Sequence, residues 1–303
     1  MATILITGGT GLIGTALTKE LLNKNHDVII LTRYPQKYSN TSRLSYAGWD
    51  LEKQIIDAGA IARADQIVHL AGAGVADKRW TRKRKKVIVE SRTKSSELII
   101  KGLRENANNV KAVIAASAIG WYGPDRINLK QFVETDLAAE DFLGTTCKEW
   151  EASIEPVISL GKRLVKLRTG IVLSNEGGAL IEFKKPLRFG IAAILGSGKQ
   201  VVSWIHIDDL ARLYIYAIEN EKLNGVYNAV APNPVTNKNL VIELAKSMRG
   251  KFFIPVYVPS FVLKLVLGEM SVEVLKSATV SCEKLKKEGY IFLYPSLKSA
   301  LQK

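Results

Sequence analysis

Short apolar runs alternate with longer amphipathic segments through the first half of the chain. The runs are short and rich in β-branched residues, whereas the longer segments place apolar residues at helical spacing. The pattern predicts strands over 4–7, 26–32, 44–49, 65–70, 111–116 and 164–168, and helices over 15–22, 81–103 and 140–159. Strands and helices that alternate in this way build a parallel sheet covered on both faces. We therefore expect an α/β fold with a doubly wound parallel sheet.

The regular alternation ends after residue 169. The sequence then predicts helices over 177–185, 207–220, 237–248 and 263–276, strands over 226–230 and 254–258, and a glycine-spotted loop or strand over 190–203. We expect two lobes, 1–170 and 171–303, with the first lobe recruiting later strands into its sheet.

The first strand leads directly into a glycine-rich turn, Gly8-Gly9-Thr10-Gly11-Leu12-Ile13-Gly14, and then into a helix. This order is typical of a dinucleotide-phosphate site. Gly8 allows a tight turn, Gly11 allows a pyrophosphate to approach the backbone, and Gly14 allows close packing of the helix. The helix N-terminus directs N–H groups at the phosphates. The predicted contacts are Gly8, Thr10, Gly11, Leu12, Ile13 and Gly14. The alternative is a glycine-rich turn in an α/β protein that binds no nucleotide.

The net charge of +14 favours anionic ligands such as nucleotides or phosphates. Much of the charge lies in the basic run 78–86, which contains one tryptophan. A nucleic-acid site is one reading of this run. We favour the other reading, in which the run forms the solvated first turns of a helix, and we regard nucleic acid as an unlikely partner.

Several features bear on location and metal binding. No apolar run reaches the length of about 18–20 residues that a membrane span requires, and the N-terminus does not resemble a signal peptide. The two cysteines, Cys147 and Cys282, are far apart, and the three histidines are scattered. We expect no metal site, no membrane partner and a reducing, cytoplasmic location.

Several segments together resemble one family. They are TGGTGLIG at 7–14, HLAGAGV at 69–75, ESR at 90–92, SAIGWYG at 117–123, LRTGIVLS at 167–174, WIHIDD at 204–209 and LGEM at 267–270. The chain resembles the atypical short-chain dehydrogenases/reductases of the extended, epimerase type, which are described as NAD(P)-dependent sugar-nucleotide epimerase-like proteins. This resemblance implies a Rossmann domain, a smaller C-terminal substrate lobe with a family-specific segment at 250–300, and NADP(H) as the cofactor.

The end of the second strand gives an independent reason to expect NADP(H). An NAD site of this fold usually has an acidic residue there to hold the ribose 2′-hydroxyl. This chain has Leu31-Thr32-Arg33 instead, and an arginine can pair with a 2′-phosphate. The alternative is an arginine that only faces solvent. The resemblance adds further candidate cofactor contacts: Leu70, Ala71, Gly72, Arg92, Arg168, Thr169 and Gly170. Arg92 has an exposed helical arginine as its alternative reading.

The catalytic residues depart from the wider superfamily, whose active members use Tyr-x-x-x-Lys on the helix after the fifth strand. Aligned on Glu151, this chain has Leu143 in place of the tyrosine and Cys147 in place of the lysine. Ser117 stands where the superfamily serine is expected. Tyr122 is the candidate substitute proton donor, with a loop aromatic that packs over the cofactor as the alternative.

These features together predict an NADP(H)-binding oxidoreductase or epimerase that acts on a small, anionic, sugar-nucleotide-like substrate. The alternative function is an NADP(H)-bound sensor or regulatory protein with little turnover, which the missing Tyr and Lys favour. We expect a monomer or a homodimer.

Overall fold

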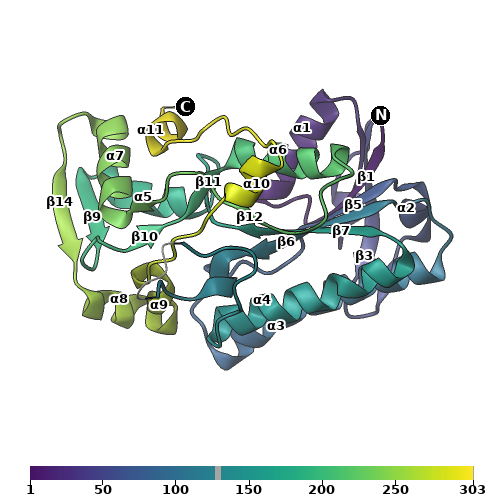
Figure 1. Cartoon of the computed structure of the whole chain (residues 1–303), viewed down its shortest axis with the longest axis horizontal. Helices are drawn as coiled ribbons and strands as arrows, with labels where there is room; N and C mark the ends of the chain where they lie inside the picture. The colour runs from purple at the N-terminus through teal and green to yellow at the C-terminus, as the bar shows by residue number, and fades with distance from the viewer. Residues whose placement is uncertain (127–130, 303) are drawn as a thin grey trace.

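One large parallel sheet forms the centre of the protein (Figure 1). The computed structural model describes residues 1–126 and 131–302. Its eight-stranded sheet has the order β12-β7-β6-β5-β1-β2-β3-β4, and only the short β4 is antiparallel to its neighbour. The strands are β1 (Thr3–Thr7), β2 (Asp27–Thr32), β3 (Leu44–Asp50), β4 (Ile55–Ile56), β5 (Gln66–His69), β6 (Ala112–Ala118), β7 (Arg163–Thr169) and β12 (Gly225–Ala229). The predicted doubly wound α/β fold is confirmed.

Helices cover both faces of this sheet because its strands are apolar on both sides. Those on the sheet are α1 (Leu12–Asn23), α2 (Ala58–Arg63), α3 (Arg82–Glu105), α4 (Phe142–Ile154) and α6 (Ile207–Glu219). Successive side chains of a strand point to opposite faces. Ile4 and Ile6 therefore share a core cluster with residues of α1 and α6, whereas Leu5 shares one with residues of α2 and α3.

A smaller lobe is built from the second half of the chain and lies at the left in Figure 1. It contains α5 (Ala179–Leu187), β9 (Ile191–Leu195), α7 (Asn237–Arg249), β14 (Ile254–Val258), α8 (Ser260–Leu267), α9 (Ser271–Leu275) and α11 (Leu297–Leu301). Shorter elements complete the chain: β8 (Ile171–Leu173), β10 (Val201–Val202), β11 (Trp204–His206), β13 (Val235–Thr236), α10 (Glu283–Lys287) and four 3-10 helices, Pro35–Lys37, Ile119–Tyr122, Glu155–Leu160 and Gly268–Met270. β12 comes from this half of the chain, yet it pairs with β7 in the large sheet.

Most predicted elements are present, with boundaries that differ by a few residues. Two predicted helices are wrong in extent. The helix predicted over 140–159 ends at Ile154 and continues as a 3-10 helix that has Pro156 at its start. The helix predicted over 263–276 is interrupted because Gly268 has a φ of +63°, so α8 and α9 are separate. The predicted loop or strand at 190–203 contains β9, which pairs with β14.

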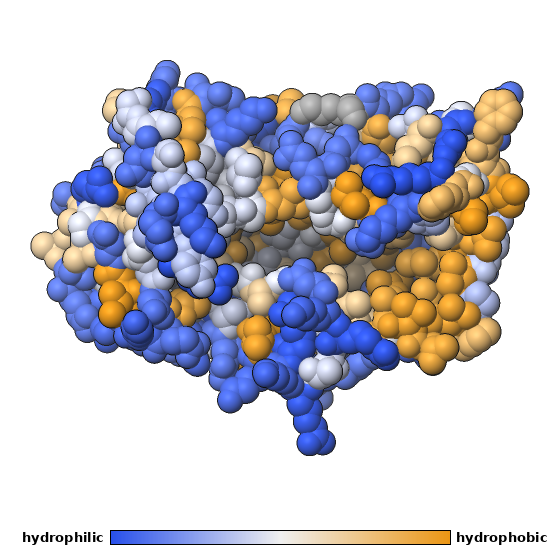
Figure 2. Space-filling view, turned by 180° about the vertical axis from the view of Figure 1, so that it is seen from behind, coloured by the Kyte–Doolittle hydropathy of each residue, from blue (hydrophilic) through white to orange (hydrophobic). Residues whose placement is uncertain are grey.

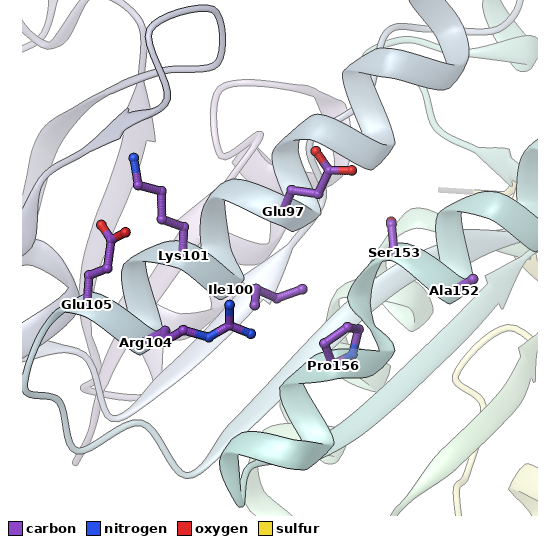
Figure 3. A pocket seen from close by; sticks show the side chains of 8 residues that line it. All are labelled: Glu97, Ile100, Lys101, Arg104, Glu105, Ala152, Ser153 and Pro156. Atoms are coloured by element: carbon purple, nitrogen blue, oxygen red, sulfur yellow. The ribbon is translucent and has the colours of Figure 1, made fainter.

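The exposed surface has two features away from the strand ends. Figure 2 shows apolar side chains gathered at the end of the molecule where β9, β14 and α8 lie. A groove of about 370 Å³ runs between α3 and α4 (Figure 3), and its lining comes from Glu97, Ile100, Lys101, Arg104, Glu105, Ala152, Ser153 and Pro156. Because α3 runs antiparallel to the strands, its C-terminal half and this groove lie toward the amino ends of the strands. Among the described residues, no helix is both long and apolar enough to cross a membrane.

Candidate functional site

The carboxyl ends of the parallel strands bring the predicted cofactor residues to one edge of the sheet. Thr7, at the end of β1, pairs with Leu31 of β2 and with His69 of β5. On the far side of β5, Ser117 and Ala118 of β6 pair with Arg168 and Thr169 of β7. The loops after these strands therefore leave the sheet side by side. The chain passes from β1 to β2 on one side and later to β5 on the other, and ligands of such sheets bind at this switch point.

The glycine-rich turn has the geometry of a phosphate cradle. Gly8 has a φ of +69°, and a Cβ there would lie 2.9 Å from the Leu70 carbonyl carbon. A Cβ on Gly14 would lie 2.4 Å from the Gly8 carbonyl oxygen, so α1 approaches the turn closely only because residue 14 is glycine. Gly11 is the N-cap of α1, is exposed and supplies no side chain to cap the helix. The first N–H groups of α1 can therefore be bound by an external anion.

The remaining residues of the turn have distinct surroundings. Thr10 is exposed, whereas Ile13 packs against the core cluster below α1. Leu12 lies against the loop at 177–178, where a Cβ on either glycine would meet its side chain at 3.3 Å. Gly9, which the sequence did not single out, is constrained by Ile30, because a Cβ there would lie 2.8 Å from that side chain.

Arg33 follows β2 directly and stands beside the glycine-rich turn at the same edge. Its side chain is exposed, and its guanidinium lies 5.9 Å from the Tyr34 ring. Within residues 1–126 and 131–302, no salt bridge involves Arg33. An exposed guanidinium without an acidic partner is available to an anionic ligand.

The segment after β5 is hydrogen-bonded to Thr7, and Thr7 contacts the buried His69. The Thr7 hydroxyl accepts hydrogen bonds from the backbone N–H groups of Leu70 and Ala71, each at 3.2 Å. The same hydroxyl lies 2.7 Å from His69 Nδ1, and His69 Nε2 lies 3.2 Å from the Ser96 hydroxyl. Burial, and then the nearby Arg92, lower the pKa of His69 from 6.5 to about 3. His69 is therefore a neutral structural residue.

Arg92 is buried, in contrast to the exposed helical arginine considered as its alternative. Its Nη1 donates to the carbonyl oxygens of Ala73 at 3.0 Å and Ile88 at 2.8 Å. Its guanidinium lies over the Trp150 ring, and a Cβ on Gly72 would lie 3.1 Å from its Cζ. Arg92 therefore fixes the segment at 71–73 against α3.

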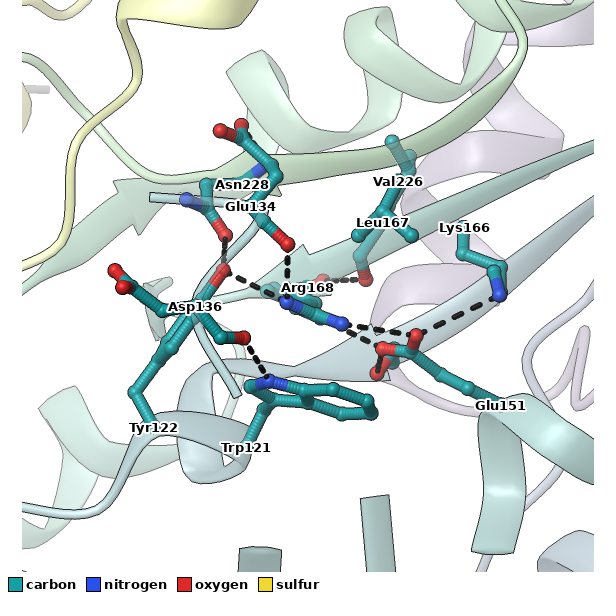
Figure 4. Close-up of polar contacts among 12 residues, drawn as sticks. Trp121, Tyr122, Glu134, Asp136, Glu151, Lys166, Leu167, Arg168, Val226 and Asn228 are labelled. Atoms are coloured by element: carbon teal, nitrogen blue, oxygen red, sulfur yellow. Dashed lines mark hydrogen bonds and ion pairs between the residues drawn. The ribbon is translucent and has the colours of Figure 1, made fainter. Parts of the chain in front are cut away.

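A buried polar network occupies the space between α4 and the ends of β6 and β7 (Figure 4). Glu151 of α4 accepts a hydrogen bond from the Ser117 hydroxyl at 2.7 Å. The same carboxylate accepts from Arg168 Nε at 2.7 Å and Arg168 Nη2 at 3.1 Å. Lys166 Nζ lies 3.6 Å from Glu151 Oε2 and also pairs with Glu155. The predicted residues Ser117 and Arg168 are therefore joined through the carboxylate of Glu151.

Tyr122 belongs to the same network. Its hydroxyl donates to Asn228 Oδ1 at 2.6 Å and accepts from Arg168 Nη1 at 2.9 Å. The side chain is 1% exposed, and burial raises the pKa of Tyr122 to about 12 although Arg168 opposes the shift. Trp121 stacks on the Arg168 guanidinium at 3.6 Å. The hydroxyls of the two catalytic candidates, Ser117 and Tyr122, are therefore both hydrogen-bonded to other side chains of the protein.

The positions of the missing catalytic pair are filled by an apolar contact. Leu143 and Cys147 both face Gly120, where an added Cβ would lie 3.2 Å from Leu143 Cβ and 3.7 Å from Cys147 Sγ. Cys147 is buried and free, and burial raises the pKa of its thiol to about 12. Neither residue supplies an acid or a base at neutral pH.

Thr169 and Gly170 lie where β7 ends. The Gly170 N–H donates to the Ala229 carbonyl oxygen at 3.1 Å, and a Cβ on Gly170 would lie 2.7 Å from the Ser203 carbonyl oxygen. The turn is therefore fixed between β11 and β12 and requires glycine.

The basic run 78–86 begins before α3 and enters its first turns, and most of it is exposed. Arg84 pairs with Asp77, and Lys85 pairs with Glu269 from the smaller lobe. Part of the run therefore connects the two halves of the chain. In the described residues, no group of three or more His, Cys, Asp or Glu side chains could hold a metal ion.

Sequence reasoning missed four residues of the network, Glu134, Glu151, Lys166 and Asn228. Glu134 joins it because its carbonyl oxygen accepts from Arg168 Nη1 at 3.2 Å and its carboxylate accepts from the Asn228 N–H at 2.9 Å. One signal was present. Lys166 and Arg168 stand two residues apart in β7, between Leu164, Val165 and Leu167, so both point to the same face. Two buried cations on one face require an acidic partner, and α4 supplies it.

Comparison with known proteins places this site in a family. A model described as the NAD dependent epimerase/dehydratase family matches residues 4–144, and a domain of unknown function, DUF1731, matches residues 258–303. An epimerase family protein of Staphylococcus aureus (strain MRSA252) is 36% identical over 302 residues, which cover 100% of this chain and 98% of that protein. One from Staphylococcus saprophyticus is 36% identical over 301 residues, 98% of this chain and 97% of that protein.

Solved structures agree with these sequence relatives. The crystal structure of the human epimerase family protein SDR39U1 (isoform 2) with NADPH has a TM-score of 0.86 and 29% identity, covering 99% of this chain and 98% of that one. The nucleoside-diphosphate sugar epimerase from Corynebacterium glutamicum has a TM-score of 0.77 and 30% identity, covering 99% of this chain and 58% of that one. The family resemblance read from the motifs is confirmed, and the chain belongs to the NAD-dependent epimerase/dehydratase family.

Proposed function

We propose that this protein is an NADP(H)-binding oxidoreductase or epimerase that acts on a small, anionic, sugar-nucleotide-like substrate. The observation that carries the NADP(H) preference is Arg33, which is exposed beside the glycine-rich turn at the end of a strand that lacks the usual acidic residue. The human relative solved with NADPH supports the same preference. The net charge of +14 and the sugar-nucleotide epimerase from Corynebacterium glutamicum support the substrate class.

In this proposal each segment at the carboxyl edge of the large sheet contacts one part of the cofactor. The turn at 8–14 and the N-terminus of α1 bind the pyrophosphate, and Arg33 binds the 2′-phosphate. The segment at 70–72, fixed by Arg92, lines the adenine side of the site. The end of β7 together with Gly170, residues 168–170, lines the nicotinamide side. The nicotinamide supplies hydride transfer when the cofactor is bound. The buried free thiols of Cys147 and Cys282 fit a reducing, cytoplasmic location.

The decisive experiment titrates NADPH and NADH against the wild-type protein and Arg33→Ala. Loss of a charge-assisted phosphate contact of roughly 1.5–3 kcal/mol weakens NADPH binding by about ten- to a hundred-fold and leaves NADH binding nearly unchanged. Arg188→Ala is the matched control, because Arg188 is also exposed but lies in the smaller lobe. Equal losses for the two cofactors would remove Arg33 from the 2′-phosphate.

The polar network favours a second candidate function, an NADP(H)-bound sensor or regulatory protein with little turnover. The hydroxyls of Ser117 and Tyr122 are bonded to Glu151, Arg168 and Asn228, and Leu143 and Cys147 replace the usual pair. A screen of sugar nucleotides and carbonyl compounds, followed by nicotinamide absorbance, separates the two functions. Turnover of any compound that depends on Ser117 or Tyr122 supports the enzyme, whereas cofactor binding without turnover supports the sensor.

A further inference from the structure

The smaller lobe exposes large apolar side chains on neighbouring elements. Phe252 is 87% exposed, Phe189 84%, Leu265 75% and Phe261 71%, and Ile254 is also exposed. Figure 2 shows a continuous apolar area at the end of the molecule where β9, β14 and α8 lie. Soluble proteins seldom expose apolar area of this kind without a binding role. We call this surface the β9–β14–α8 face.

Phe189 and Phe252 lie near the start of β14, whereas Phe261 and Leu265 follow its end, on α8. The Ile254 N–H donates to the Gly190 carbonyl oxygen at 2.8 Å, which brings Phe189 next to the segment at 252–254. β14 then leads through Pro259 directly into α8. On α8, Phe261 and Leu265 are four residues apart and therefore share one side of the helix.

Basic residues outnumber acidic ones around this face. The segments 183–200 and 244–268, which contain β9, β14 and α8, have four basic residues each. Acidic residues flank these segments, and two of them, Glu182 and Glu243, pair with Lys185 and Lys246. Lys251 and Lys264 are exposed, and neither takes part in a salt bridge within the part of the chain that the structure describes. Lys264 lies on α8 between Phe261 and Leu265, so cations are mixed into the apolar surface. An occupant of this face must accept both apolar side chains and positive charge.

A second copy of the chain does not meet that requirement. A symmetric contact would bring Lys251 and Lys264 of both copies together, and the flanking Glu182 and Glu243 are already paired with Lys185 and Lys246. Pairing of β14 with another strand is also hindered. Because the Ile254 N–H points to β9, the next backbone nitrogen points to the free edge, and that residue is Pro255, which has no N–H to donate. Proline on an edge strand is a common way to prevent strand pairing.

We propose that the β9–β14–α8 face binds the surface of an anionic phospholipid bilayer. Lysine is depleted at the centres of protein–protein interfaces, but at a bilayer its long stem lies along apolar surface while its ammonium reaches lipid phosphates. Phe and Leu side chains among basic residues are typical of proteins that rest in the membrane interface. The contact is peripheral, so it agrees with the lack of a spanning helix among the described residues. It revises the expectation of no membrane partner, which rested on the absence of a span-length run.

The test is flotation of the purified full chain with vesicles of phosphatidylcholine alone or mixed with phosphatidylserine. We expect the wild-type protein to float with the mixed vesicles and much less with phosphatidylcholine alone. Lys251→Glu with Lys264→Glu lowers binding to the mixed vesicles by about tenfold or more, because each cation near an anionic surface contributes about a fivefold effect. Phe252→Ser with Phe261→Ser lowers binding at unchanged net charge. All four side chains are exposed, so these variants are expected to fold.

Matched controls lie elsewhere on the surface. Leu137→Ser removes an exposed apolar side chain outside the face, and Lys83→Glu reverses a charge in the basic run; neither is expected to reduce flotation. Unchanged flotation of the face variants would overturn the proposal. So would loss of flotation in Lys83→Glu, or a wild-type dimer in solution that Phe252→Ser with Phe261→Ser converts to a monomer. NADPH titration of every variant keeps this result separate from the proposed cofactor site, since the face variants should bind NADPH normally.

Discussion

Replacement of Arg168 by methionine tests whether the buried network stabilises the junction of α4 with the sheet. Methionine retains an unbranched apolar stem like that of arginine but lacks the guanidinium. The substitution therefore removes the two hydrogen bonds to Glu151 and the hydrogen bond to the Tyr122 hydroxyl. Glu151 then stays buried, and its partners among residues 1–126 and 131–302 are Ser117 and the more distant Lys166. A buried ion pair that loses one member costs about 3–5 kcal/mol, a large share of the roughly 5–15 kcal/mol that stabilises a typical domain.

The free energy of unfolding is measured by urea denaturation, followed by tryptophan fluorescence because Trp121 stacks on the Arg168 guanidinium. Lys24→Met is the matched control. It breaks the exposed pair between Lys24 and Glu219, which is worth about 0–1 kcal/mol. A double-mutant cycle with Glu151→Leu adds a second measurement, since the double variant leaves neither charge unpaired. We expect the loss of unfolding free energy in the double variant to be smaller than the sum of the losses in the two single variants by about 2–3 kcal/mol.

Two results would refute this reasoning. One is an Arg168→Met variant that is no less stable than Lys24→Met. The other is full additivity of Arg168→Met and Glu151→Leu, because independent sites add whereas a direct ion pair does not. The first result would mean that Arg168 contributes little to stability, and the second that its contribution does not come from the pair with Glu151.

Three further predictions concern the cofactor edge. Gly11→Val should abolish NADPH binding while the circular dichroism spectrum stays unchanged. Gly14→Ala should also abolish binding, and it should lower the thermal midpoint of unfolding because its Cβ would lie 2.4 Å from the Gly8 carbonyl oxygen. NADPH affinity retained in either variant would contradict the phosphate site. His69 has a depressed pKa, so the unfolded chain binds its proton first, and the wild-type protein should lose stability as pH falls from 6.5 toward 3. His69→Gln should flatten that part of the pH profile, and a profile identical to wild type would refute the assignment. Tyr122→Phe should cost about 1–3 kcal/mol of stability by leaving buried partners unbonded, and should cut kcat by roughly 10²–10⁴ if Tyr122 is the general acid; an unaltered kcat would exclude that role.

The sequence predicts the sheet and the glycine-rich turn well because their signals are local. Ile4–Thr7 is apolar on both faces, and the glycines that follow are required by contacts within a few residues or with the adjacent strand. The break between α8 and α9 was missed because an apolar helical pattern continues across Gly268. Only the backbone shows that its φ is +63°.

The polar network could not be predicted because its partners are distant in sequence. Ser117 and Glu151 are 34 residues apart, and Tyr122 and Asn228 are 106 apart. A single sequence places Ser117, Tyr122 and Arg168 at the correct edge, but it does not show which groups their polar atoms bond. The apolar β9–β14–α8 face was invisible for a related reason, since an apolar strand pattern predicts burial and says nothing about a missing neighbour.

The relative size of two effects on Tyr122 determines what chemistry its hydroxyl can perform. In the wider superfamily a lysine ammonium beside the tyrosine lowers the tyrosine pKa. Here the Arg168 guanidinium, 2.9 Å from the Tyr122 hydroxyl, also favours the phenolate. Burial acts in the opposite direction and is the larger effect, so the pKa rises to about 12. Tyr122 is therefore protonated at neutral pH and can act only as a proton donor. Because its own proton is directed at Asn228, donation to a substrate requires that hydrogen bond to break first, by rotation of the hydroxyl about its C–O bond.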